Sequence, residues 1–145
     1  MVEALGEMDM KRLIRIQVED VEGLSNLELA KSVWEDLFGR CWHEYRRCRI
    51  GMGFEYRCTK CGDLRGTEDL RMTYLERRRP LYNLHKAWPI VNQWQKDSLP
   101  FLKALEVVKN TRKRTQLMFG LKARDICVAG LAATRYRRDF PLEDE

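Results

Sequence analysis

The residues best suited to chemistry lie between Arg40 and Gly62, in the segment RCWHEYRRCRIGMGFEYRCTKCG. This segment contains four of the five cysteines and one of the two histidines of the chain. A structural zinc ion takes four ligands in a tetrahedron, drawn mainly from thiolate sulfur and imidazole nitrogen. The segment therefore predicts a zinc site, and the elements around it must position the ligands.

The downstream pair of ligands is Cys58 and Cys61, which are separated by two residues. At this spacing a tight turn brings both sulfurs to one side, where they can bind one ion. Gly62 follows directly, and glycine readily adopts the positive φ that such a turn often needs. The pair thus has the form of a zinc knuckle.

The upstream pair must come from Cys41, His43 and Cys48. Cys41 and His43 are two residues apart, so in an extended segment their side chains point the same way. We therefore expect the ligands to be Cys41, His43, Cys58 and Cys61. The competing set is Cys41, Cys48, Cys58 and Cys61.

The segment between the two pairs predicts a β-hairpin. Gly51 and Gly53 indicate a turn, and Phe54, Tyr56 and Cys58 alternate with polar residues as in a strand. One ligand pair then lies at the start of the first strand, and the other lies at the end of the second strand. Four protein ligands leave no position for water, so the zinc ion would be structural. The alternatives are free buried cysteines or disulfides, and disulfides are disfavoured inside cells.

Basic residues are distributed unevenly along the chain. Residues 1–40 carry 5 Lys/Arg and 9 Asp/Glu, whereas residues 41–140 carry 22 and 10. A basic body suggests an acidic partner, either nucleic acid or an acidic protein face, and the alternative is a merely solvated surface. The residues we expect to contact such a partner are Arg46, Arg47, Arg49, Arg77, Arg78, Arg79, Lys109, Arg112, Lys113, Arg114, Arg135, Arg137 and Arg138.

Length and composition are typical of a small globular protein. The chain has 145 residues, of which 44% are hydrophobic and 34% charged. No apolar run approaches the ~20 residues that a membrane span needs. The first ten residues, MVEALGEMDM, are acidic and lack a secretory pattern. We therefore expect a cytoplasmic location and no membrane partner, which agrees with cysteines used as metal ligands.

The elements before the zinc segment are predicted from periodicity. Residues 1–9 are expected to be weakly ordered, and residues 11–20 alternate apolar and polar side chains as a half-buried strand does. Residues 25–38 have the 3.6-residue periodicity of an amphipathic helix. Ser25 and Glu28 are spaced as a capping box at its start.

The elements after the zinc segment are predicted to be mainly helical. Helices are expected over residues 67–78, 83–96, 98–109 and 123–136, and a short strand over 115–119. A strand over 105–108 is the alternative to part of the third helix. The last helix is rich in small residues and is expected to pack closely on a sheet.

Two of these helices carry specific expectations. The helix over 83–96 should bury one face formed by Leu84, Ala87, Trp88, Val91 and Trp94. Pro89 should kink this helix or delay its start to Trp88. The helix over 98–109 should be capped by Ser98 and should bury Leu99, Leu102, Leu105 and Val108. Cys127, in the last helix, is expected in the core.

The predicted fold class is α+β, with a small zinc-ribbon β-hairpin embedded in a mainly helical domain with a small sheet. Residues 1–40 form an N-terminal strand and helix, and residues 41–66 form the zinc ribbon. Residues 67–140 form a mainly helical C-terminal part that packs with the N-terminal helix as one domain.

The order of the motifs resembles that of small bacteriophage proteins with a C-x-H…C-x-x-C zinc ribbon. The matching segments are NLELAK from Asn26, CWHEY from Cys41 and CTKCG from Cys58. Two further segments, LHKAWPIV from Leu84 and ARDICVAGLA from Ala123, resemble helices of the phage domain described as an αβα sandwich.

This resemblance covers about residues 24–135 and carries its own expectations. It implies that Cys41 and His43, rather than Cys48, are the upstream ligands. It also implies a small phage-encoded accessory protein that works in the host cytoplasm and has no enzymatic activity.

We compare three possible functions, of which the third is an enzyme. The first is a phage-type accessory protein that binds and modulates a host macromolecular machine, in transcription or defence, by protein–protein contact. The second is a basic zinc-ribbon protein that binds nucleic acid with weak sequence specificity, because aromatic residues (Tyr45, Phe54, Tyr56 and Tyr136) interleave with the arginines. An enzyme is disfavoured, because the sequence has no phosphate loop, nucleophile triad or paired-carboxylate motif.

Overall fold

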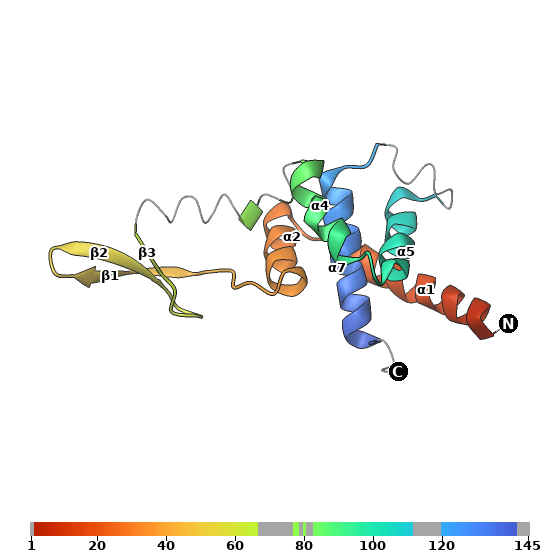
Figure 1. The fold of residues 1–145 in the computed structure, drawn as a ribbon, viewed down its shortest axis with the longest axis horizontal. Coiled ribbons are helices and arrows are strands. Elements are labelled where there is room, and N and C mark those ends of the chain that lie inside the picture. Colours follow the sequence, from red (N-terminus) through yellow and green to blue (C-terminus); the bar gives the residue numbers. More distant parts are fainter. Residues whose placement is uncertain (1, 67–76, 79, 81–82, 112–119, 142–145) are drawn as a thin grey trace.

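The computed structural model describes residues 2–66, 77–78, 80, 83–111 and 120–141. The helices within residues 2–37 and 84–139 pack together, and we call them the helical body. A three-stranded sheet projects from one side of this body (Figure 1). The predicted fold class, a mainly helical domain with a small sheet at the Cys/His cluster, is confirmed. In the described part of the chain, no helix is both long enough and apolar enough to cross a membrane.

The first element is the helix α1, Val2–Glu22, and not the strand that was predicted over residues 11–20. Ile14, Val18 and Val21 are fully or almost fully buried, and their spacing is helical. Ile16 belongs to the apparent strand alternation but is 51% exposed. The prediction was wrong because a helix with buried residues four apart can imitate alternation over a short window. Residues 2–9, expected to be weakly ordered, are part of α1.

The next helix is confirmed, together with its cap. The helix α2, Asn26–Ser32, begins after Ser25, which accepts a hydrogen bond from the backbone N–H of Glu28 while the Glu28 carboxylate accepts one from Ser25. The helix then widens into the π-helical turn η1, Val33–Leu37. Gly39, with φ of 64°, turns the chain toward the sheet.

The helix α4, Leu84–Gln93, begins directly after Asn83, the first residue of the predicted range. The Asn83 side chain accepts a hydrogen bond from the backbone N–H of Lys86. Pro89 lies inside the helix, so the start is not delayed to Trp88 as one expectation had it. Proline at this position cannot donate a hydrogen bond to the carbonyl one turn back, and its ring crowds that carbonyl, so the packing of the helix must offset this cost.

The apolar face of α4 differs from the predicted one. Ala87 and Ile90 are fully buried, whereas Leu84 and Trp88 are each 40% exposed. The buried stripe is thus rotated toward Ile90. The neighbour that α4 packs against, and not the intrinsic hydrophobicity of its residues, decides which apolar side chains are covered.

The helix α5, Ser98–Lys109, is confirmed over the alternative of a strand at 105–108. Its N-cap residue is Asp97 rather than Ser98, and no side chain makes a capping hydrogen bond there. Leu105 is buried as expected, but Leu99 is 38% exposed. The other buried residues of α5 are Pro100, Phe101 and Ala104.

The helix α7, Ala123–Asp139, lies at the centre of the helical body and contacts α1, α4, α5 and η1. The expectation that it packs on a sheet was wrong, because its described neighbours are helices and the described sheet lies apart from them (Figure 1). Its buried residues include four alanines, and Gly130 lies in the middle of the buried face. These small residues let several helices approach one axis closely.

The sheet consists of β1, Tyr45–Ile50, β2, Gly53–Cys58, and β3, Leu64–Arg65, paired antiparallel in that order. The hairpin between β1 and β2 is confirmed, and Gly51 has the positive φ of 58° at its turn. We call the segment 45–65 the ribbon. The predicted helix over 67–78 and strand over 115–119 lie wholly or almost wholly outside the described residues.

We predict that Gly130→Ala destabilises the protein. A β-carbon at this position would lie 2.4 Å from Ile90 Cγ2 and 3.0 Å from Leu37 Cδ1. The overlap should cost about 1–3 kcal/mol, which outweighs the gain of up to about 1 kcal/mol in helix propensity. Urea denaturation would measure the change. Gly66→Ala is the control, because its β-carbon would meet open space. A Gly130→Ala protein as stable as the wild type would contradict this account of the α7 interface.

Candidate metal centre

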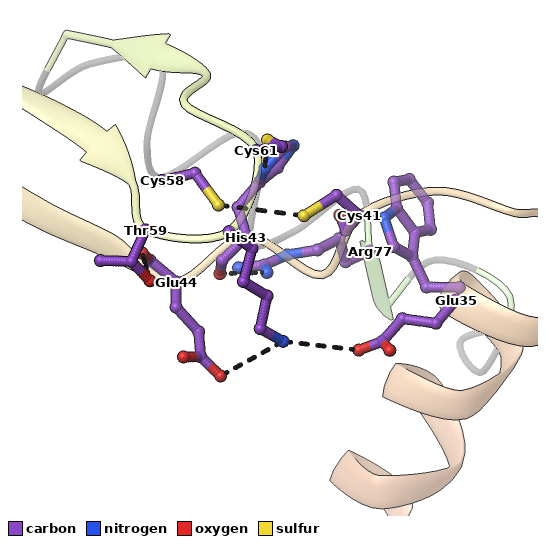
Figure 2. Close-up of polar contacts among 10 residues, drawn as sticks. Glu35, Cys41, His43, Glu44, Cys58, Thr59, Cys61 and Arg77 are labelled. Atoms are coloured by element: carbon purple, nitrogen blue, oxygen red, sulfur yellow. Dashed lines mark hydrogen bonds and ion pairs between the residues drawn. The ribbon is translucent and has the colours of Figure 1, made fainter.

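The structure brings together the four predicted ligands, Cys41, His43, Cys58 and Cys61, so that they could bind a metal ion. Their ligand atoms all lie within 4.8 Å of one another. The Sγ atoms of Cys41 and Cys58 are 3.8 Å apart, and Cys61 Sγ lies 3.2 Å from His43 Nδ1 (Figure 2). All five cysteines are free, so no disulfide competes for these sulfurs.

The sulfur–sulfur distance is the one a tetrahedral ion requires. Zn–S bonds of about 2.3 Å that meet at the tetrahedral angle place two sulfurs about 3.8 Å apart. The separation of Cys41 and Cys58 matches this value. The Cys61–His43 separation is slightly shorter than the ~3.5 Å expected for one sulfur and one nitrogen ligand. Thiolate and imidazole ligands suit a soft or borderline ion and not magnesium or calcium.

Local backbone structure positions each ligand. Cys41 and His43 lie between η1 and β1, in a segment without regular secondary structure, and Cys58 is the last residue of β2. After Cys58 the chain turns tightly, with the backbone N–H of Gly62 bonded to the Cys58 carbonyl at 2.9 Å and φ of 77° at Gly62. The turn that the C-x-x-C-G spacing predicted is therefore present and places Cys61 beside His43.

Two side chains hold the segment that carries the upstream ligands. One belongs to the helical body, and the other belongs to the chain that follows the ribbon. The Trp34 indole Nε1–H donates to the Cys41 carbonyl at 2.9 Å, and Arg77 Nη1 donates to the His43 carbonyl at 2.8 Å. The Arg77 guanidinium also lies 4.2 Å from the centre of the Trp42 ring. Arg77 is only 1% exposed. Such partners fix the orientation of metal ligands and are part of the site.

A third link joins the downstream ligand turn to the helical body. Lys60, between the two downstream cysteines, lies 3.9 Å from Glu35 of η1 and 3.4 Å from Glu44. The backbone N–H of Thr59 also bonds to the Glu44 carbonyl at 3.0 Å. The two halves of the ligand cluster are thus tied to each other and to η1.

The thiols of the cluster differ in how readily they ionise. Burial of the Cys58 thiol opposes ionisation, but backbone hydrogen bonds from Cys61 and Lys60 and a side-chain hydrogen bond with His43 outweigh it and lower the pKa to about 6. Burial raises the pKa of Cys41 to about 11, with the neighbouring Cys61 and Cys58 adding to the effect. Because the thiolate is the form that ligates metal, Cys58 is preorganised as a ligand.

Tyr45 and Asp63 form a hydrogen-bond network beside the ligand turn, together with Arg65. The Tyr45 hydroxyl donates to Asp63 Oδ2 at 2.8 Å, and Arg65 Nε donates to the same oxygen at 2.9 Å. These hydrogen bonds lower the pKa of Asp63. Burial, together with Asp63, raises the pKa of Tyr45 to about 12. The network joins β1 to β3 next to the ligand turn.

The two remaining cysteines lie outside the cluster. Cys48 is on β1 opposite Glu55, and its Sγ lies 3.7 Å from the Arg46 carbonyl. The alternative ligand set with Cys48 is therefore not the one that the fold assembles. Cys127 is fully buried in α7 as predicted, and burial raises the pKa of its thiol to about 12.

The structure describes nine of the predicted partner-binding residues, and several of them are exposed. Arg46, Arg47 and Arg49 are exposed on the ribbon, and Arg78 and Arg138 are exposed elsewhere. Lys109 ends α5. Arg79, Arg112, Lys113 and Arg114 lie outside the described residues.

Three arginines of the predicted set are bound to the protein itself. Arg77 is buried, and Arg137 makes a two-pronged ion pair with Asp97 at 2.8 and 3.1 Å. Arg135 Nε lies 4.0 Å from Asp36. Their structural contacts make them weaker candidates for a partner surface. Sequence reasoning missed the roles of Arg77 and Trp34 at the metal centre, because both act through backbone carbonyls that leave no motif.

Comparison of the chain with models of known protein families, with curated proteins and with solved structures finds no match. The resemblance to bacteriophage zinc-ribbon proteins therefore stays a prediction, and the function must be argued from the geometry of the chain.

We predict one tightly bound metal ion per chain, lost when a ligand is replaced. Cys58→Ser or His43→Ala should abolish stoichiometric metal and should unfold at least the ribbon, because binding energy at such a site is folding energy. Inductively coupled plasma mass spectrometry of the purified proteins would measure the metal. Cys48→Ser is the matched control and should keep the ion. If Cys48→Ser loses the metal while His43→Ala retains it, the ligand assignment is wrong.

Proposed function

We propose that the cluster binds zinc as a structural ion and that the protein acts by binding and not by catalysis. Cys41, His43, Cys58 and Cys61 form the Cys₃His set typical of structural zinc sites. Four protein ligands leave no open coordination position for a water or a substrate. Trp34 and Arg77 donate hydrogen bonds to the backbone carbonyls of two ligands, which suits a structural site with fixed ligand positions.

The function that the geometry supports best is nucleic-acid binding through the ribbon. The observation that carries it is the set of exposed arginines, Arg46, Arg47, Arg49 and Arg57, on a hairpin that projects from the helical body (Figure 1). The strands β1 and β2 contain only one acidic residue, Glu55, against these four cations. A projecting cationic hairpin can reach a polyanion without steric conflict with the body of the protein.

Binding of this kind should depend mainly on phosphate contacts. Arginine pairs well with phosphate, and such contacts supply affinity without reading sequence. The described helices carry none of the base-reading motifs of known DNA-binding proteins. Weak sequence specificity is therefore part of the proposal.

The second candidate is the phage-type accessory role, in which the protein modulates a host machine by protein–protein contact in the host cytoplasm. The observation that favours it is the exposed apolar surface around Trp88, next to an almost wholly apolar cavity of about 230 Å³ lined partly by Trp94 and Phe101. Exposed apolar surface of this kind often marks an interface. A stoichiometric complex with one host protein that survives nuclease and high salt would favour this role.

We predict that affinity for a labelled oligonucleotide falls steeply with salt. If the ribbon contacts about three or four phosphates, the slope of log affinity against log salt should be about −2 to −3 for a single strand and about −3 to −4 for a duplex. Arg47→Gln with Arg49→Gln should weaken binding and flatten the slope by about 1–2. Fluorescence anisotropy between 50 and 200 mM NaCl would measure both.

The matched control for this experiment removes two exposed arginines that lie off the ribbon, Arg78→Gln with Arg138→Gln. It changes the net charge by the same amount and should leave the slope nearly unchanged. Absence of binding at low salt, or an equal loss in both double variants, would contradict nucleic-acid binding through the ribbon.

A further inference from the structure

The pairing register of the ribbon separates its side chains into two different faces. Residues directly opposite each other in an antiparallel pair share a face, and neighbours along a strand alternate. The observed pairs are Arg47 with Tyr56, Arg49 with Phe54, Tyr45 with Cys58, and Tyr56 with Arg65. One face therefore carries Tyr45, Arg47, Arg49, Phe54, Tyr56 and Arg65, and we call it the stacking face.

The opposite face has another composition. It carries Arg46 opposite Arg57, Cys48 opposite Glu55, and Leu64 opposite Arg57. It thus has two arginines and one carboxylate but no aromatic side chain among these positions. Both faces are basic, so the aromatic rings are what distinguish them.

We propose that the stacking face binds single-stranded nucleic acid, with bases stacked on Phe54 and Tyr56 and phosphates held by the arginines beside them. The proposal rests on the proposed function and names the form of nucleic acid and the surface. Proteins that bind single strands combine a basic track with aromatic rings on which successive bases stack. The register of the ribbon places both features on one face.

Phe54 is the residue of this surface on which the proposal depends most. It is 53% exposed near the tip of the ribbon, where a large apolar ring gains nothing from the core. The Arg47 guanidinium lies 4.6 Å from the centre of the Phe54 ring. Aromatic rings and guanidinium planes are both surfaces on which unpaired bases stack. The Arg47–Phe54 pair thus offers a stacking surface with a positive charge already in place.

The spacing along β2 suits more than one base. Phe54 and Tyr56 are two residues apart, which places them about 6.6 Å from each other along the strand. An unstacked single strand can put one base on each ring at this separation. Arg49 lies opposite Phe54, and Arg47 lies opposite Tyr56, so each ring has an arginine directly across the strand pair.

A duplex would use this surface differently. Its bases are paired and stacked on one another, so their faces are not available to Phe54 or Tyr56. Duplex phosphates could be contacted by arginines of either face, Arg46 and Arg57 included. The stacking face therefore predicts both a preference for single strands and a difference between the two faces.

The test is fluorescence anisotropy of the zinc-loaded full chain with a labelled 20-nucleotide oligo(dT) and a labelled 20-base-pair duplex. The wild type should bind the single strand more tightly than the duplex. Phe54→Ala should weaken single-strand binding roughly tenfold, the loss expected for one stacked base, and Phe54→Trp should retain it. Neither change should alter duplex binding by more than about twofold. Metal content and circular dichroism would establish that each variant is folded.

The matched charge variants are Arg49→Gln on the stacking face and Arg46→Gln on the opposite face of the same strand. Single-strand affinity should fall at least threefold more for Arg49→Gln than for Arg46→Gln. Equal losses, unchanged binding by Phe54→Ala, or tighter binding of the duplex would overturn the stacking face while leaving nucleic-acid binding in place. Failure of the wild type to bind either probe would overturn the proposed function as well.

Discussion

The geometry of the ribbon depends on the four-residue cluster at its base. Cys41 and His43 come before β1, and Cys58 and Cys61 come at and after the end of β2, so one ion bound there would fasten both ends of a hairpin. A two-stranded hairpin is marginally stable alone in water, and here β3 adds only two residues. Metal ligation would supply the constraint that a hydrophobic core would otherwise supply.

The helical body rests on a different constraint. Helices α1, α4, α5 and η1 all contact α7, and Gly130 sets how closely Ile90 and Leu37 can approach it. The metal cluster meets this body through Trp34 of η1, whose indole holds the Cys41 carbonyl. The architecture is thus a packed helical scaffold that presents the ribbon, and the ribbon carries the exposed arginines on which the proposed function rests.

Local chemistry was predictable from the sequence where spacing alone decides it. Cys58 and Cys61 with a following glycine specify a turn, and Ser25 with its acidic partner specifies a helix start. The N-terminal helix was missed because Ile14 and Val18 fit both a strand and a helix, and packing on α5 and α7 decides between them. Arg77 was placed on a partner surface because nothing local shows that it bonds to His43, 34 residues away.

We expect a metal ion at the Cys/His cluster to organise the ribbon and the helical body to fold without that ion. Backbone hydrogen exchange, measured by mass spectrometry on the zinc-loaded protein and after removal of zinc with a chelator, would test this expectation. Chelation should abolish protection in β1 and β2 and leave that of α5 and α7 unchanged. Protection that persists in the ribbon after chelation, or that is lost throughout α7, would contradict the account.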